Sequence, residues 1–160
     1  MDKDKLFSYH KWAAIACLQH VQTLGEEFYS KEGVNSFASI QETTEHVLGV
    51  EKLWLLRMSG VTNPKFEHFD VETTDKAIEA YGSLHEEMGV FFSSLTDQQW
   101  EETLHYRNMR GDKFYTTREE MLFTFVNHAS YHRGQVTSLL RQFGKEGIAL
   151  DYIYYQKENR

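Results

Sequence analysis

Apolar residues recur at steps of three and four along four stretches of the chain, which is the period of an amphipathic helix. The first stretch covers about residues 4–24, and Gly25 ends it because glycine readily adopts the conformations that follow a helix. The second follows the polar segment SKEGVNS, where Ser36 is the expected N-cap, and stops at SGVTNP, whose glycine, asparagine and proline oppose a helix. The apolar faces contain Phe7, Ala14, Leu18 and Val21 in the first helix, and Ile40, Thr43, Val47, Val50, Trp54 and Met58 in the second.

A third helix is predicted within residues 72–97, entered through Thr73 or Thr74. Its apolar face is marked by Ile78, Tyr81, Met88 and Leu95, with Phe91 and Phe92 widening it. The next segment, ETLHYRNMRGDKFYTT, is rich in aromatic and β-branched residues on either side of a glycine. This pattern predicts a short β-hairpin that turns near Gly111.

The fourth helix has the clearest start, because Thr117 and Glu120 form the pattern of a capping box, and it should run to Gly144. The connections between the first and second helices, and between the third and fourth, are unequal in length. We therefore expect an all-α fold: a four-helix bundle with a long crossover connection and a short β-hairpin insert before the last helix. The absence of repeats or a low-complexity linker predicts a single domain over residues 1–160.

Composition and charge disfavour several classes of function. The chain has 17 basic and 24 acidic residues, a formal net charge of −7 and no Lys/Arg-rich run, so no nucleic-acid partner is expected. No apolar run approaches the ~18 residues of a membrane span, and the first residues lack the apolar core of a signal peptide. The single Cys17, set among small apolar residues, is expected to be a buried, inert thiol rather than a functional one. We expect a soluble cytoplasmic protein.

Two histidines lie four positions apart in the segment NHASYHRGQV, residues 127–136. His128 and His132 continue the apolar face of the fourth helix, so both imidazoles should point into the bundle. Either they are core histidines bonded to hydroxyl or carbonyl groups, or they are two ligands of a metal ion. Ala129 stands where the H-E-x-x-H motif of metallopeptidases has its glutamate, which disfavours a peptidase.

His46 is the third candidate ligand, because it lies beside the apolar face of the second predicted helix. Three neutral imidazoles from two helices would hold a divalent ion and leave coordination positions open for water or substrate. Imidazole suits zinc, nickel, copper and iron. His85 lies beside the third apolar face and is a weaker candidate. The histidines expected at the surface or in loops are His10, His20, His68 and His105.

Two motifs resemble the signatures of the DinB-like (YfiT-like) metalloprotein family. TTEHVLGVEKLW is similar to the family pattern T-x-x-H-x-x-x-x-E-x-x-W, and NHASYHRGQV is similar to N-H-x-x-x-H-R-G-Q. The matching positions are Thr43, His46, Glu51 and Trp54 in the first motif, and Asn127, His128, His132, Arg133, Gly134 and Gln135 in the second. The resemblance covers nearly the whole chain, including an aromatic C-terminal segment that begins at Asp151.

The resemblance implies a four-helix bundle with a metal site formed by His46, His128 and His132. It implies a divalent transition metal, with zinc or nickel expected first and iron or copper as alternatives. Characterised relatives include transferases and isomerases that use a low-molecular-weight thiol such as bacillithiol or mycothiol, so such a thiol is a candidate cofactor. The family also implies a homodimer, which agrees with the eleven Phe, nine Tyr and three Trp residues of this chain.

Glu51, Gln135 and Thr43 are candidates for side chains that support the metal site. Glu51 either orients a ligating imidazole or pairs with Arg133 as part of the structure. Gln135, one turn beyond the second motif histidine, is placed to contact a metal-bound water, and Thr43 belongs to the same motif as His46. Arg133 itself lies about 100° round the helix from the neighbouring histidine and is expected to anchor the bundle or hairpin.

Three functions fit these residues. The leading one is a metal-dependent transferase or hydrolase that acts on a small molecule, because a metal with an open position makes a nucleophile from water or a thiol at neutral pH. The second is a metal-binding stress-response protein without catalytic turnover. The third is an interaction module with a structural metal, which is weakened because structural zinc usually has four protein ligands and often cysteines.

Overall fold

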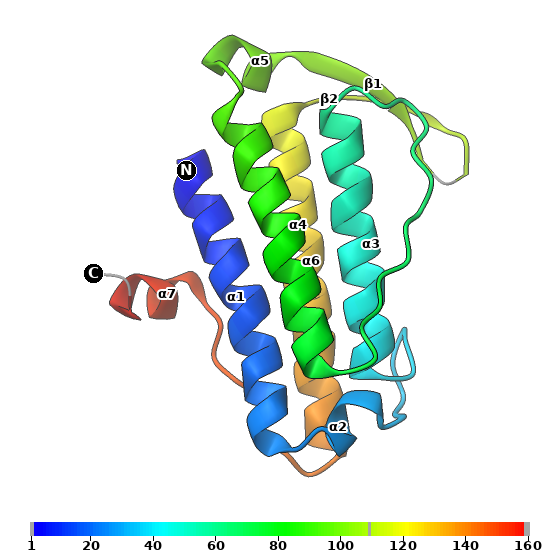
Figure 1. Cartoon of the computed structure of the whole chain (residues 1–160), viewed down its shortest axis with the longest axis vertical. Helices are drawn as coiled ribbons and strands as arrows, with labels where there is room; N and C mark the ends of the chain where they lie inside the picture. The colour runs from blue at the N-terminus through cyan, green and yellow to red at the C-terminus, as the bar shows by residue number, and fades with distance from the viewer. Residues whose placement is uncertain (1, 109, 159–160) are drawn as a thin grey trace.

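Four long helices form the body of the computed structural model, which describes residues 2–108 and 110–158 (Figure 1). They are α1 (Lys3–Leu24), α3 (Ile40–Met58), α4 (Thr74–Ser93) and α6 (Arg118–Gln142). Three short helices were not expected from the periodicity: α2 (Glu27–Ser30), α5 (Asp97–Glu101) and α7 (Tyr152–Glu158). An antiparallel hairpin of β1 (Thr103–Arg107) and β2 (Lys113–Thr117) precedes α6. The predicted four-helix bundle with a hairpin before its last helix is therefore confirmed.

Side chains at the helix starts explain where the helices begin. Thr117 Oγ1 accepts from the backbone N–H of Glu120 at 3.2 Å and Glu120 Oε2 accepts from the N–H of Thr117 at 2.8 Å, which is the predicted capping box. The predicted cap of the second long helix is wrong, because α3 is capped by Ser39 and not by Ser36. The Ser36 hydroxyl instead accepts from Gln135 Nε2 at 2.8 Å, so the loop before α3 packs along α6.

The first two long helices, α1 and α3, lie diagonally opposite each other in the bundle. The main interhelical contacts join α1 with α4 and α6, and α3 with the same two helices. The long crossover is the connection between α3 and α4, residues 59–73, which runs along the side of the bundle so that these two helices point the same way (Figure 1). As a result α3 packs beside α6, although 59 residues lie between the end of one and the start of the other.

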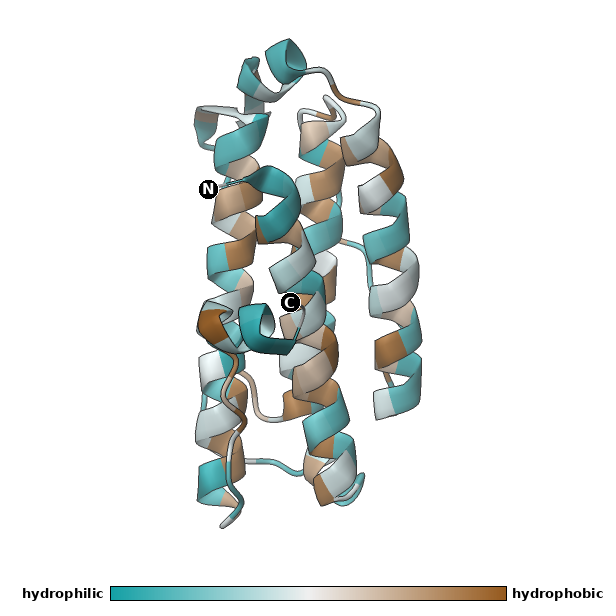
Figure 2. Ribbon diagram, turned by 90° about the vertical axis from the view of Figure 1, so that its left-hand side faces the viewer, coloured by the Kyte–Doolittle hydropathy of each residue, from teal (hydrophilic) through white to brown (hydrophobic). Residues whose placement is uncertain are grey.

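The apolar faces meet in one core that runs the length of the bundle. Hydrophobic and hydrophilic residues alternate around each long helix (Figure 2). Core residues with no exposed surface include Val21, Ile40, Leu48, Met58, Met88, Met121, Phe125 and Leu139. Among the helices that the structure describes, none combines the length and apolarity that a membrane crossing requires.

A glycine on α3 allows the crossover to lie close to the bundle. The ring of Phe66, in the crossover, occupies the space that a Cβ on Gly49 would fill. The close approach fixes the path of the crossover, because any larger side chain at this position must displace the ring.

We therefore expect Gly49→Ala to lower the free energy of unfolding by about 1–3 kcal/mol, despite the better helix propensity of alanine. Gly82→Ala is the matched control, because Gly82 is an exposed glycine of α4, and apart from its chain neighbours and the backbone of its own helix no atom lies within 4 Å of the place that its added methyl group would take. This control should raise the free energy of unfolding by up to about 1 kcal/mol. Urea denaturation measures both changes, and equal effects at the two sites would contradict the close packing.

Candidate metal centre

Three imidazoles meet where α3 packs against α6. His46 comes from α3, and His128 and His132 come from successive turns of α6. The Nε2 atom of His128 lies 3.0 Å from Nε2 of His132 and 3.3 Å from Nε2 of His46. The ligand atoms of all three side chains lie within 4.8 Å of one another. The structure therefore brings together the three histidines that the sequence selects as a candidate metal triad.

The separations suit one cation surrounded by nitrogens. Zinc binds histidine nitrogen at about 2.0–2.1 Å, so two such ligands stand about 2.9 Å apart at a right angle and about 3.4 Å apart at a tetrahedral angle. The separations of 3.0 and 3.3 Å fall within this range. Hydrogen bonding alone explains the arrangement less well, because His128 Nε2 faces both other rings but carries only one proton or one lone pair.

Gln135 determines which nitrogen of His132 is free to bind a metal. Its amide nitrogen donates to Ser36 Oγ at 2.8 Å, and its Oε1 atom lies 2.8 Å from Nδ1 of His132. Nδ1 is therefore the protonated nitrogen, and Nε2 carries the lone pair that faces the other two imidazoles. The sequence placed Gln135 near a metal-bound water, whereas the structure shows it bonded to the imidazole itself.

The surroundings keep these imidazoles in their neutral form. Burial, with a smaller effect from the neighbouring His132, lowers the pKa of His46 to about 4. Burial and the proximity of the other two rings lower the pKa of His128 to about 4. Burial also lowers the pKa of His132, although the bond to Gln135 opposes this change. Neutral imidazole is the form that binds metal, so the triad is ready to bind at neutral pH.

Two aromatic rings border the triad. The Phe37 ring centroid lies 4.5 Å from that of His46 and 5.8 Å from that of His132, and Tyr131 lies 5.2 Å from His132. Phe37 belongs to the loop before α3, which is fastened to α6 partly by Asn35 Nδ2 donating to a backbone carbonyl of α6 at 3.1 Å. Phe37 has no signal in the sequence that marks it as part of the site, because its loop has no helical period.

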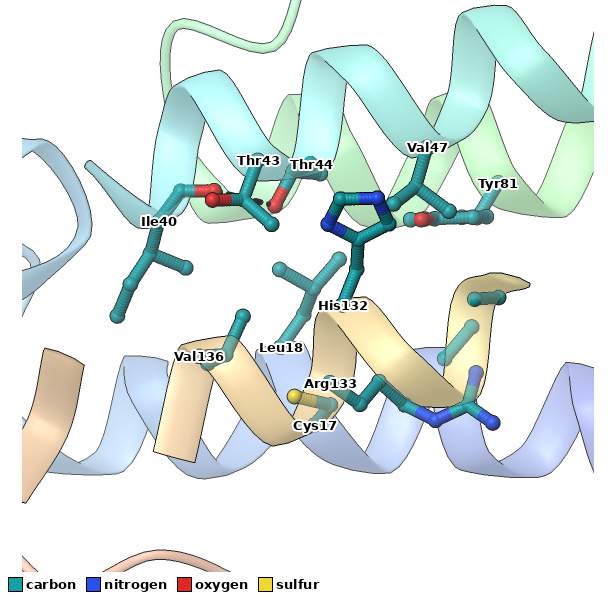
Figure 3. Close-up of a pocket in the computed structure, with 12 residues that line it drawn as sticks. Cys17, Leu18, Ile40, Thr43, Thr44, Val47, Tyr81, His132, Arg133 and Val136 are labelled. Carbon is teal, nitrogen blue, oxygen red and sulfur yellow. Dashed lines mark hydrogen bonds between the residues drawn. The ribbon is translucent and has the colours of Figure 1, made fainter. Parts of the chain in front are cut away.

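A cavity of about 30 Å³ lies beside His132 in the interior of the bundle (Figure 3). Its polar lining consists of Cys17, Thr43, Thr44, Tyr81, His132 and Arg133. This volume holds about one or two water molecules. The Thr43 hydroxyl donates to the carbonyl of Ser39 at 2.8 Å, and within the described residues it makes no hydrogen bond to a triad imidazole. Thr43 therefore lines the cavity next to the triad and does not orient a ring.

The prediction that Cys17 is buried is confirmed. Burial raises the pKa of its thiol to about 11, so the reactive thiolate is scarce at neutral pH.

Glu51 belongs to a second cluster, in which it contacts His10 and His85 and not the triad. His85 Nε2 lies 3.0 Å from Glu51 Oε2, and His10 Nε2 lies 3.1 Å from Glu51 Oε1. The prediction that His10 is a surface or loop residue is wrong, because His10 has no exposed surface. Its position three residues after Phe7 and four before Ala14 places it on the buried face of α1.

Neither role expected for Glu51 is seen in the described residues. It orients no triad imidazole, and it forms no ion pair with Arg133, whose Nη2 donates to Ser130 Oγ at 2.7 Å. Burial alone would raise the pKa of Glu51, but the facing imidazoles of His10 and His85 outweigh burial and lower the pKa. Burial lowers the pKa of His10, against the effect of the carboxylate.

The remaining histidines lie away from both clusters. His68 is an exposed residue of the crossover that contacts Glu45 Oε1 at 2.7 Å. His105 is exposed on β1, and the half-buried His20 Nε2 lies 2.8 Å from the carbonyl oxygen of Glu146.

Comparison with known proteins identifies the family of the chain. The whole chain, residues 1–160, matches the DinB family. The chain belongs to the DinB family. It is 30% identical over 157 residues to Protein DinB of Bacillus subtilis, an alignment that covers 94% of this chain and 91% of that protein.

Two solved structures share the fold of this chain. A DinB-like protein from Bacillus cereus superposes with a TM-score of 0.68 at 19% identity, covering 89% of this chain and 91% of that one. YfiT from Bacillus subtilis superposes with a TM-score of 0.67 at 16% identity, covering 90% and 89% of the two chains. YfiT is described as a probable metal-dependent hydrolase with an unusual four-helix bundle topology. Because the sequence identities are below 20%, these superpositions show only that this chain has the same fold.

The triad gives the metal-free protein a pH-dependent stability. His46 and His128 have pKa values of about 4 in the folded protein and about 6.5 in an unfolded chain, so the unfolded state binds more protons between these values. We expect the urea midpoint to decrease as the pH falls from about 6.5 to about 4.

The decrease should be shallower in His46→Gln, which removes one of the titrating rings. His68→Gln, at an exposed histidine, should leave the decrease unchanged. An identical pH dependence in unmodified protein and His46→Gln would show that the ring is not kept neutral by the fold.

Proposed function

We propose that this DinB-family protein is a metal-dependent transferase or hydrolase acting on a small molecule, with His46, His128 and His132 as ligands of a divalent transition metal. The observation that carries the proposal is the convergence of three Nε2 atoms at separations that suit one cation. Imidazole suits zinc, nickel, iron and copper alike, and we take zinc and nickel as the first candidates with iron or copper as the alternatives.

The number of protein ligands favours a catalytic role over a structural one. Catalytic zinc sites commonly have three protein ligands and an open position, whereas structural sites have four. The bound metal would supply a Lewis acid that lowers the pKa of a coordinated water or thiol. The protein's part is to hold the rings: Gln135 fixes the tautomer of His132, and burial keeps His46 and His128 neutral.

The identity of the nucleophile separates two versions of this enzyme. Water would make it a hydrolase, in line with the description of YfiT. A low-molecular-weight thiol such as bacillithiol would make it a transferase, with the electrophilic small molecule bound next to Phe37 and Tyr131, whose rings border the triad.

A metal-binding stress protein without turnover is the second candidate. The observation that favours it is the position of Glu51, because this buried carboxylate is engaged by His10 and His85 and is not free to act as a general base at the triad. Assays of the metal-loaded protein separate the candidates. Two rates are measured: conjugation of a thiol to a chloronitrobenzene, and hydrolysis of small esters and amides. If the protein is an enzyme, at least one rate should be higher for the unmodified protein than for a variant that lacks a triad histidine. Equal rates for the two proteins in both assays would favour the second candidate.

Removing any triad ring should cost the protein one equivalent of metal. We expect His46→Ala, His128→Ala and His132→Ala each to retain one equivalent less than the unmodified protein after mild chelation, because two imidazoles hold an ion far more weakly than three. Elemental analysis measures this change. The controls are His68→Ala and His105→Ala, at exposed histidines, and full metal retention by the triad variants would exclude the assignment.

Gln135→Leu should weaken metal binding about 10–100-fold while leaving the three ligands in place, because the acceptor that fixes the His132 tautomer is lost. Ser36→Ala is the matched control, since it breaks the other bond of the same amide and keeps the contact with the imidazole. Competition with a zinc chelator measures both affinities. Equal weakening in the two variants would mean that fastening of the loop, and not the tautomer, sets the affinity.

We also propose that the protein is a homodimer. Light scattering should give twice the mass of 18.9 kDa at micromolar concentration. A monomer mass that persists up to millimolar concentration would rule the dimer out.

A further inference from the structure

A second group of metal-binding side chains lies deep in the bundle. His10 comes from α1, Glu51 from α3 and His85 from α4, and their exposed fractions are 0%, 0% and 4%. Their ligand atoms all lie within 4.8 Å of one another. This cluster shares no residue with the His46, His128 and His132 triad.

Hydrogen bonds account for only half of the contacts around the carboxylate. The His85 Nε2 and Glu51 Oε2 atoms, 3.0 Å apart, are a hydrogen-bonded pair. His10 Nε2 and Glu51 Oε1 lie 3.1 Å apart, yet neither atom has a hydrogen-bonding partner of acceptable geometry. A buried polar atom left without a partner destabilises the folded state, so the arrangement needs a further explanation.

Aromatic rings surround the cluster, and the positive charge of Arg133 acts on it without an ion pair to Glu51. The rings of Phe7 and Phe125 lie 6.3 and 5.3 Å from the His10 ring, and Tyr81 lies 5.3 Å from the His85 ring. In the described part of the chain, no lysine or arginine forms an ion pair with Glu51. A buried carboxylate normally has a cationic partner or coordinates a metal.

We propose that His10, Glu51 and His85 form a second divalent-cation site, distinct from the triad. Two imidazole nitrogens and one carboxylate are a donor set that suits iron(II), manganese and zinc. The nitrogen–oxygen separations of 3.0 and 3.1 Å match adjacent ligands, each about 2.0–2.2 Å from one ion. The ion would satisfy both atoms of the unbonded pair at once. It would also replace the hydrogen bond between His85 and Glu51, with His85 taking the tautomer protonated at Nδ1 so that Nε2 offers its lone pair.

The role that follows from this position is structural. The cluster is enclosed by packed rings and ties three helices together, with α1 and α3 on a diagonal of the bundle. A cation held there would stabilise the folded chain by mass action, because the unfolded chain cannot assemble the three ligands. The proposal is independent of any reaction at the triad.

The test counts metal equivalents in the full chain. Protein stripped with a chelator is titrated with zinc or manganese and analysed for metal after gel filtration. Four proteins are compared: unmodified chain, Glu51→Gln, His46→Gln with His128→Gln, and all three substitutions together. Glu51→Gln keeps the size of the side chain, removes its charge and replaces one of the two acceptor oxygens with an amide nitrogen, which does not ligate a cation.

We expect two equivalents in the unmodified chain, one in Glu51→Gln, one in the triad variant and none in the combined variant. The melting temperature of the triad variant should rise with metal, and that of the combined variant should not. One equivalent in the unmodified chain and in Glu51→Gln, with none in the triad variant, overturns the proposal. If Glu51→Gln does not fold, the triad variant decides: retention of one equivalent supports the second site and loss of all metal excludes it.

Discussion

The packing of α3 against α6 is the contact on which the site depends. It is formed by two helices that are distant in sequence, and it places His46 opposite two successive turns of α6. The crossover makes the packing of α3 against α6 possible. It returns the chain along the side of the bundle, so that α3 and α4 run in the same direction and α6 packs beside α3 (Figure 1). Gly49 serves the same arrangement, because the absence of a side chain at this position lets Phe66 and the crossover lie against α3.

Burial disfavours the charged form in both polar clusters of the core, but the neighbouring side chains lead to different outcomes. In the triad it disfavours protonation, so that three imidazoles share a small space without mutual repulsion. Around Glu51 the imidazoles of His10 and His85 hold a carboxylate in its charged form within an apolar interior. The same bundle thus keeps the triad imidazoles neutral and the Glu51 carboxylate ionised, because different side chains surround the two clusters.

Much of the fold and of the triad is predictable from local signals, whereas contacts between distant segments are not. The helical period locates the four long helices, and His128 and His132 continue an apolar face, while His46 needs the family motif as well. His10 is in phase with Phe7 and Ala14 on α1, so the period alone indicates burial, and its polarity is the misleading signal. The loop that carries Phe37 is held by bonds to α6, a contact between segments about 100 residues apart. The partners of Glu51 come from two other helices, so its role is set by the order of helices around the bundle.

Anomalous diffraction from a crystal grown with zinc or nickel tests the metal triad most directly. We expect an anomalous peak about 2.0–2.1 Å from the Nε2 atoms of His46, His128 and His132, with at least one coordination position not filled by protein. A peak that contacts fewer than these three rings, or a triad without a peak under saturating metal, would contradict the assignment.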